Sequence, residues 1–122
     1  MIVRRLDPER AAPIQMEGAQ RVRMEILVGR ADGAPTFSMR HFVVEPGGHT
    51  PHHHHDYEHE VLIIEGLAEV TLGERVERVE SGHALFIPAN VLHQFRNAGA
   101  GPMRFVCMVP TSFDCGKPTP GS

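Results

Sequence analysis

Short apolar runs recur along the chain, and glycines and prolines separate one run from the next. Several runs alternate apolar and polar residues, as Leu67–Leu72 does, and a period of two is typical of a strand with one buried face. No segment has the period of a long helix, and we expect only one short helical turn, within Pro8–Ala19. The pattern indicates an all-β fold, an antiparallel sandwich or barrel. Strands are predicted over Val22–Val28, Phe37–Glu45, Glu60–Ile64, Ala68–Leu72, Ala84–Ile87, Val91–Arg96 and Met103–Val109.

The length of the chain predicts one domain. With 122 residues it can build a single core but not two, and it carries no internal repeat and no linker. We predict a single barrel domain over residues 21–110, with an N-terminal arm over 1–20 and a loose C-terminal tail over 111–122. Arms of this kind are either disordered or docked on a partner subunit.

Composition and charge argue against several classes of protein. The apolar fraction of 41% is ordinary for a globular domain, and the formal net charge of −3 comes from interspersed acidic and basic residues. Since there is no basic stripe and no long apolar segment, we expect neither nucleic acid nor a membrane as a partner. No signal peptide is recognisable, so we expect a cytoplasmic protein in which Cys107 and Cys115 are reduced thiols.

The most informative feature is a cluster of histidines in the middle of the chain. Four consecutive imidazoles stand at His52–His55, and His59 and His93 follow. Two glycines, Gly47 and Gly66, frame the first group. Several neutral imidazoles gathered at one place suit a transition metal ion.

Parity divides the consecutive histidines into two pairs. Successive side chains of an extended chain point to opposite faces, so His53 and His55 face one way and His52 and His54 the other. We therefore expect the first pair to face the site and the second pair to be exposed at the mouth of the barrel.

His59 and His93 can reach the same site only if turns redirect the chain. Four residues of extended chain span roughly 13 Å, too far for one ion to join His59 to the first pair. A turn at Asp56-Tyr57 is therefore needed to fold His59 back. His93 must arrive from a distant strand, after the turn residues Pro88-Ala89-Asn90.

Two spaced motifs around these histidines resemble the two motifs of the cupin family. The first runs from Gly47 through five residues, His53-His54-His55, three residues, His59 and six residues to Gly66. The second runs from Gly82 through five residues, Pro88-Ala89-Asn90, two residues, His93 and three residues to Asn97. The chain departs from the family pattern where His59 replaces a glutamate and where Asn90 replaces a glycine. Asparagine also tolerates a left-handed backbone, so the second change is mild.

The resemblance implies both a fold and a metal site. The fold is an antiparallel double-stranded β-helix, also called a jelly-roll barrel. The stretch from Pro46 to Glu60 resembles small single-domain (cupin 2) members with an all-histidine site, which implies one divalent transition metal, whether Mn, Fe, Ni, Cu or Zn. The implied ligands are His53, His55, His59 and His93, with Glu60 as the alternative to His59. Parity leaves that choice open because both faces of the strand are apolar. His41, His49 and His83 are expected to be ordinary surface or core histidines.

Four more residues are candidates for the pocket. Arg40 and Cys107 are the candidate catalytic residues, Arg40 as a cation for an anionic substrate and Cys107 as a thiol near the metal. A solvated strand arginine and a buried core thiol are the alternatives. Phe95 and Phe105 are expected to line the pocket, with plain core packing as the alternative for the first.

These residues predict a function at the level of chemical class. The favoured hypothesis is a dioxygenase that uses the metal to activate an enolisable or phenolic, anionic or chelating small molecule together with O₂. A non-catalytic binding or sensing protein and a metal-dependent isomerase or lyase without O₂ are the alternatives. We also predict a homodimer, because open sheet edges need cover. Metal loss is expected below about pH 6, near the pKa of free histidine.

Overall fold

The computed structural model describes residues 1–14 and 16–113. The predicted tail lies outside the described residues from residue 114 onward, and so does Cys115. The prediction of an all-β fold is confirmed. The strands are β1 (Ala12–Pro13), β2 (Gln20–Val28), β3 (Phe37–His49), β4 (His59–Glu65), β5 (Leu67–Leu72), β6 (Arg75–Glu80), β7 (Ala84–Ile87), β8 (His93–Asn97) and β9 (Met103–Pro110).

Three single turns of 3-10 helix complete the described secondary structure. They are η1 (Pro8–Arg10), η2 (Arg30–Asp32) and η3 (Thr111–Phe113). The first lies within the segment where the sequence predicts one helical turn, and Asp7 caps it by accepting a hydrogen bond from the backbone of Glu9. No helix in this part of the chain has the length or apolar character needed to cross a membrane.

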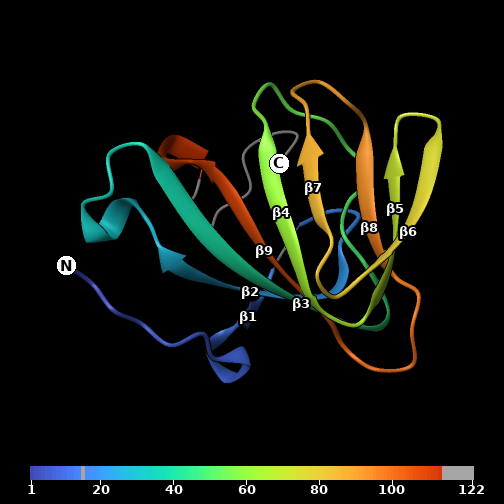
Figure 1. The fold of residues 1–122 in the computed structure, drawn as a ribbon, viewed down its shortest axis with the longest axis horizontal. Coiled ribbons are helices and arrows are strands. Elements are labelled where there is room, and N and C mark those ends of the chain that lie inside the picture. Colours follow the sequence, from blue (N-terminus) through green and yellow to red (C-terminus); the bar gives the residue numbers. More distant parts are fainter. Residues whose placement is uncertain (15, 114–122) are drawn as a thin grey trace.

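All strand pairs are antiparallel, and together they form one strongly curled sheet. The order along it is β6-β5-β8-β3-β9-β4-β7, with β2 added to β3 and β1 added to β2. The ribbon curls from the long strands β2 and β3 round to the β5–β6 hairpin (Figure 1). This arrangement confirms the cupin or jelly-roll type that the resemblance implies.

The core fills the inside of this curl because the strands alternate as the sequence predicts. In β9, Phe105, Cys107 and Val109 are buried, while Met108 between the last two is exposed. Phe105 stacks on Phe42 of β3, with 4.8 Å between ring centroids. Stacked aromatic pairs of this kind stabilise a core beyond the area they bury.

Two strands were not expected from the sequence. β6 reads Arg-Val-Glu-Arg-Val-Glu and is almost wholly exposed, so it has no apolar face to give a period of two. It forms because its backbone pairs with β5 along six residues. β1 lies within the predicted N-terminal arm and pairs with Met24 and Arg23 of β2.

The described part of the predicted arm is anchored through a buried carboxylate. Glu25 accepts hydrogen bonds from Arg10 Nε at 3.1 Å and from the backbone nitrogen of Asp7 at 2.9 Å. His41, which is fully buried, receives a hydrogen bond from Arg104 at Nε2 and therefore donates from Nδ1 to Glu25 over 2.7 Å. Burial opposes ionisation of Glu25, but these donors outweigh it and lower its pKa.

The outer face of the sheet carries exposed apolar side chains, which we call the outer apolar row. Its members come from β3, β9, β4 and β7, which are neighbours in the sheet. Met39 and Met108 lie directly opposite each other across the β3–β9 pair. The row consists of Phe37, Met39, Leu62, Phe86 and Met108.

Candidate metal centre

Backbone hydrogen bonds bring the two histidine motifs together. The backbone nitrogen of His53 donates to the carbonyl of His93 at 3.1 Å, and that of His93 donates to the carbonyl of His53 at 2.8 Å. The nitrogen of Asn90 donates to the carbonyl of His55 at 2.7 Å. Asn90 has a φ of 67°, the left-handed conformation for which the family pattern uses glycine. The tight turn before His93 is therefore retained despite the substitution.

The chain bends at Asp56-Tyr57, as the sequence predicts, and so returns for His59 at the start of β4. Tyr57 is buried and lies between two rings. Its ring stacks on His55 at 4.0 Å and on Phe113 at 3.8 Å between centroids. This stack fixes the plane of the His55 imidazole.

Three histidines form a compact donor cluster. One ring nitrogen each from His53, His55 and His93 lies within 4.8 Å of the other two. The three ring centroids are 4.9 to 5.3 Å apart, and the rings meet edge to face. His55 and His93 are buried and His53 is half-buried, so the cluster is open to the cleft on one side.

The backbone also sets which nitrogen of two rings carries the proton. A carbonyl oxygen can only accept, so His55 donates from Nδ1 to the carbonyl of Tyr57 at 3.2 Å. His93 likewise donates from Nδ1 to the carbonyl of Val91 at 3.0 Å. The Nε2 atom of each ring is then unprotonated and available as a ligand, which is the orientation that metal-binding histidines need.

His59 contacts the cluster at His55 but is not among the three histidines whose donor atoms all lie within 4.8 Å of one another. The Nε2 atoms of His59 and His55 are 2.6 Å apart, and Nδ1 of His59 lies 2.9 Å from Sγ of Cys107. Two ligands of one tetrahedral ion lie about 3.4 Å apart, so these two rings must separate before both can bind the same ion. Glu60, the alternative to His59, is exposed on the opposite face of β4. The carboxylate therefore points away from the cluster.

Burial keeps the clustered imidazoles neutral. It lowers the pKa of His53 and His55 to about 4, with the positive charge of neighbouring imidazoles as the next cause. It lowers the pKa of His59 to about 2 and also lowers the pKa of His93. Near neutral pH the rings are thus in the form that binds a metal.

The donor set fits a divalent transition ion. Two nitrogens held about 2.1 Å from one tetrahedral ion lie about 3.4 Å apart, and the three clustered donors all lie within 4.8 Å of one another. The backbone hydrogen bonds between the two motifs hold the segments that carry these donors beside each other.

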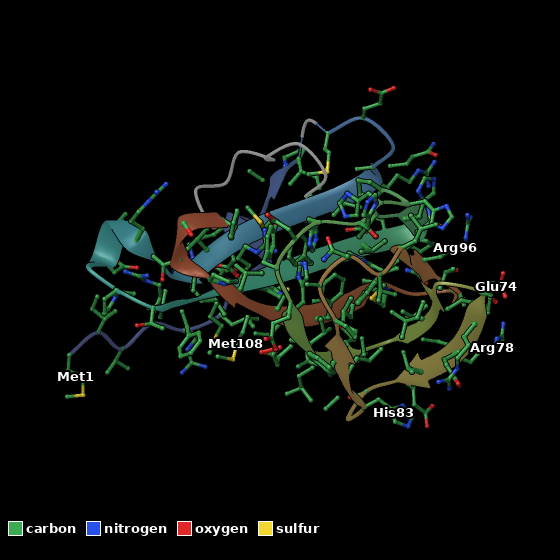
Figure 2. The ribbon with its side chains drawn as sticks, turned by 90° about the horizontal axis from the view of Figure 1, so that it is seen from above. Met1, Glu74, Arg78, His83, Arg96 and Met108 are labelled. Atoms are coloured by element: carbon green, nitrogen blue, oxygen red, sulfur yellow. The ribbon has the colours of Figure 1, made fainter. Side chains whose placement is uncertain are left out.

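The other histidines are not members of the cluster. His52 and His54 are exposed, as their parity predicts, and His49 is half-buried on β3. His83 points outward from the sheet (Figure 2). His41 is buried, but against Glu25 rather than in the cluster.

A cleft leads from the surface to the cluster. Its empty volume is about 690 Å³, counting the part open to solvent. The four residues predicted for the pocket, Arg40, Cys107, Phe95 and Phe105, all line it. The remaining lining residues are Ile14, Met16, Met24, Phe42, Thr50, Pro51, His53, His59, Val61, Ile87 and His93.

Sequence reasoning missed the N-terminal contribution to this cleft. Ile14 and Met16 come from the predicted arm, and Met24 comes from β2. The sequence contains no motif for them, since their position follows from how β1 and β2 add to the sheet. They add three apolar side chains to the lining of the cleft.

Arg40 and Cys107 lie opposite each other in the β3–β9 pair. Nη2 of Arg40 is 3.7 Å from Sγ of Cys107, and its guanidinium carbon lies 5.1 Å from the centre of the Phe42 ring. Nε of Arg40 is buried and has no hydrogen-bond partner among the described residues. Burial raises the pKa of Cys107, and the arginine opposes that effect. The thiol is therefore protonated at neutral pH.

Comparison with known proteins identifies relatives of the chain. A family model described as a cupin domain matches residues 40–109. The solved structure of the polyketide cyclase RemF from Streptomyces resistomycificus is 32% identical, with a TM-score of 0.81, and the match covers 90% of this chain and 80% of that one. A cupin 2 domain-containing protein from Halorhodospira halophila is 38% identical, with a TM-score of 0.71 and coverage of 77% and 65%.

A match to a curated enzyme is more partial. The 1-methylthio-D-xylulose 5-phosphate methylsulfurylase of Rhodospirillum rubrum is 34% identical over 79 residues, which cover 65% of this chain and 51% of the enzyme. The chain spans about half the length of that relative and 16% of the mannose-1-phosphate guanylyltransferase of Salmonella typhimurium. These likenesses therefore concern the barrel rather than whole enzymes.

Proposed function

Because this chain belongs to the cupin family, we propose that it is a metal-dependent enzyme acting on an enolisable or phenolic small molecule. His53, His55 and His93 hold one divalent transition ion, whether Mn, Fe, Ni, Cu or Zn, and His59 supplies the fourth nitrogen. One observation carries the proposal. The Nε2 atoms of His55 and His93 are unprotonated because backbone carbonyls hold the opposite nitrogens.

The expected substrate follows from charge. Four neutral imidazoles leave the charge of a divalent ion uncompensated, and a partly buried positive charge attracts an anionic or chelating ligand. When bound, such an ion supplies Lewis acidity that lowers the pKa of an attached OH or C–H acid.

The protein's own residues prepare the cleft for that chemistry. Phe95, Phe105 and Val61 form apolar walls around the histidines and exclude water from the reacting atoms. Cys107, whose pKa is raised by burial, stays a thiol, and its Sγ lies 2.9 Å from Nδ1 of His59. That contact directs Nε2 of His59 towards the other donors.

We favour a reaction that needs no O₂, a cyclisation or isomerisation by proton transfer. The likeness to RemF, a polyketide cyclase with a TM-score of 0.81, supports this choice. The dioxygenase expected from the sequence stays a prediction, and so does the non-catalytic binding protein. All three share the metal site and differ in what they do with a bound substrate.

The first test is metal content. Untagged protein purified without a metal column is analysed for its elements, together with His93→Ala and the matched variant His54→Ala, whose side chain is exposed. We expect about one ion per chain in the wild type and in His54→Ala, and much less in His93→Ala. Equal metal content in all three proteins would remove the proposed site.

The second test separates the reactions. The metal-loaded protein is incubated with a panel of β-diketones and phenols, with and without oxygen, and substrate loss and oxygen uptake are followed together. Turnover without uptake supports the reaction proposed. Turnover that requires oxygen would support the dioxygenase instead. Tight binding without turnover would support the non-catalytic binding protein.

A further inference from the structure

We propose that the cleft contains, beside the histidine cluster, a subsite for an anionic group of the substrate, with Arg40 as its cation. This inference rests on the proposed function for the position of the reacting atoms. The binding of the anion itself depends on the arginine alone.

The surroundings of Arg40 leave its charge unpaired within the described residues. The neighbours it contacts are the Sγ atom of Cys107 at 3.7 Å and the ring of Phe42 at 5.1 Å. A thiol sulfur is a weak acceptor, and a phenyl face attracts a cation without accepting a hydrogen bond. Nε is buried without a partner in this part of the chain, so the guanidinium retains hydrogen-bonding capacity that an anion can use.

Arg40 supplies the fixed positive charge of the cleft. Its lining, within the residues that the structure describes, includes one arginine and three histidines but no aspartate or glutamate. In contrast, Arg10, Arg23 and Arg104 each pair with a carboxylate elsewhere in the fold. Arg40 lines the same cleft as His53 and His59. A half-buried positive charge with no carboxylate beside it among the described residues favours an anionic ligand.

The shape and polarity of the cleft narrow the class of ligand. A guanidinium presents two parallel N–H groups that match the oxygens of a carboxylate or a sulfonate. The aromatic side chains of Phe42, Phe95 and Phe105 lie in the same cleft and favour a planar, apolar body. We therefore assign to the cleft a conjugated or aromatic small molecule with one oxyanion group, which Arg40 binds while the rest of the molecule faces the histidines.

The experiment uses a charged probe that is a poor metal ligand. Binding of naphthalene-2-sulfonate and of its neutral analogue methyl 2-naphthyl sulfone is measured by calorimetry at pH 7.5 and one fixed ionic strength. The protein is used as isolated, with its metal content determined. The variants are Arg40→Gln, Arg40→Lys and, as a matched surface control, Arg96→Gln, whose side chain is exposed and points outward (Figure 2). Circular dichroism checks the fold of each.

We expect the wild type and Arg96→Gln to bind the sulfonate at least about tenfold more tightly than the sulfone, as expected for hydrogen bonds to a charged group. Arg40→Gln should lose that preference while it binds the sulfone normally, and Arg40→Lys should keep part of it. An unchanged preference in Arg40→Gln overturns the inference. The absence of sulfonate binding by the wild type does so as well.

The outcome is separable from that of the proposed function. Loss of the preference in Arg40→Gln, in a protein that retains no metal and turns over no substrate, supports the anion subsite and rejects the metalloenzyme. If the protein binds metal and is active, but Arg40→Gln binds the sulfonate as tightly as the wild type does, only the anion subsite is rejected.

Discussion

Acidification provides a quantitative test of the buried histidine cluster. Free histidines are half protonated near pH 6.5, so an exposed site would lose its metal around pH 6. In the folded protein the pH at which metal is lost should be lower, because burial lowers the pKa of His53 and His55 to about 4. At pH 5 an imidazole with a pKa of 6.5 must give up a proton at a cost of about 2 kcal/mol before it binds metal, whereas one with a pKa of 4 costs almost nothing.

The two histidines together thus save about 4 kcal/mol at pH 5, or about a thousandfold in metal affinity. Protein loaded with one equivalent of zinc is dialysed against buffers from pH 7.5 to 3.5, and the retained metal is measured with circular dichroism in parallel. We expect full retention at pH 5 and release near pH 4. Release centred near pH 6.5 from protein that is still folded would refute the reasoning.

The same pKa values predict how the metal-free protein responds to acid. The folded-state pKa of His53 and His55 lies below the unfolded value, so the unfolded chain binds more protons between the two. This contribution to stability is fully present above about pH 6.5 and is lost as the pH falls to about 4. The full pKa difference corresponds to about 3 kcal/mol for each histidine, and solvent screening reduces the actual contribution below that value. Urea denaturation of metal-free protein across this range measures the loss.

Three further predictions concern stability and assembly. Gly66 has a φ of 87°, and a Cβ there would lie 2.5 Å from the carbonyl oxygen of Pro102, whereas a Cβ at Gly73, with a φ of 60°, would meet open space. In urea denaturation, Gly66→Ala should therefore lower the free energy of unfolding by at least about 2 kcal/mol more than Gly73→Ala does. Equal losses in the two variants would contradict the clash. Glu25→Gln removes the charge that holds the N-terminal segment and should cost about 2 kcal/mol or more in the same assay, so an unchanged midpoint would refute the anchoring role. The homodimer stays a prediction, and we assign the outer apolar row as its contact surface. Light scattering should give the mass of two chains for the wild type and of one chain for Phe86→Lys. A single-chain mass for the wild type would reject the dimer.

Much of the fold follows from the sequence because glycine and proline punctuation and strand periodicity are local signals. The predicted strands correspond to β2, β3, β4, β5, β7, β8 and β9, with shifted ends. β6 could not be predicted, since its valines recur every third residue and neither face is apolar. Its strand conformation comes from pairing with β5, and the sequence of β6 itself does not indicate that pairing.

The histidine site shows where parity succeeds and where it fails. Parity correctly separates the inward His53 and His55 from the exposed His54. It does not choose between His59 and Glu60, because the outer face of β4 is as apolar as the inner one. The structure explains why, since Leu62 on that outer face belongs to the outer apolar row. A strand with two apolar faces cannot be oriented from its own sequence.

The paired backbone bonds between His53 and His93 also have a consequence for biosynthesis. A nascent polypeptide that has emerged only as far as the first motif presents an incomplete chelator, because its remaining donor is still to be translated. In the proposed metalloenzyme, the three clustered donors therefore come together only after β8 has joined the sheet. The folded polypeptide, rather than an unfolded run of imidazoles, would then set the geometry that a bound ion meets.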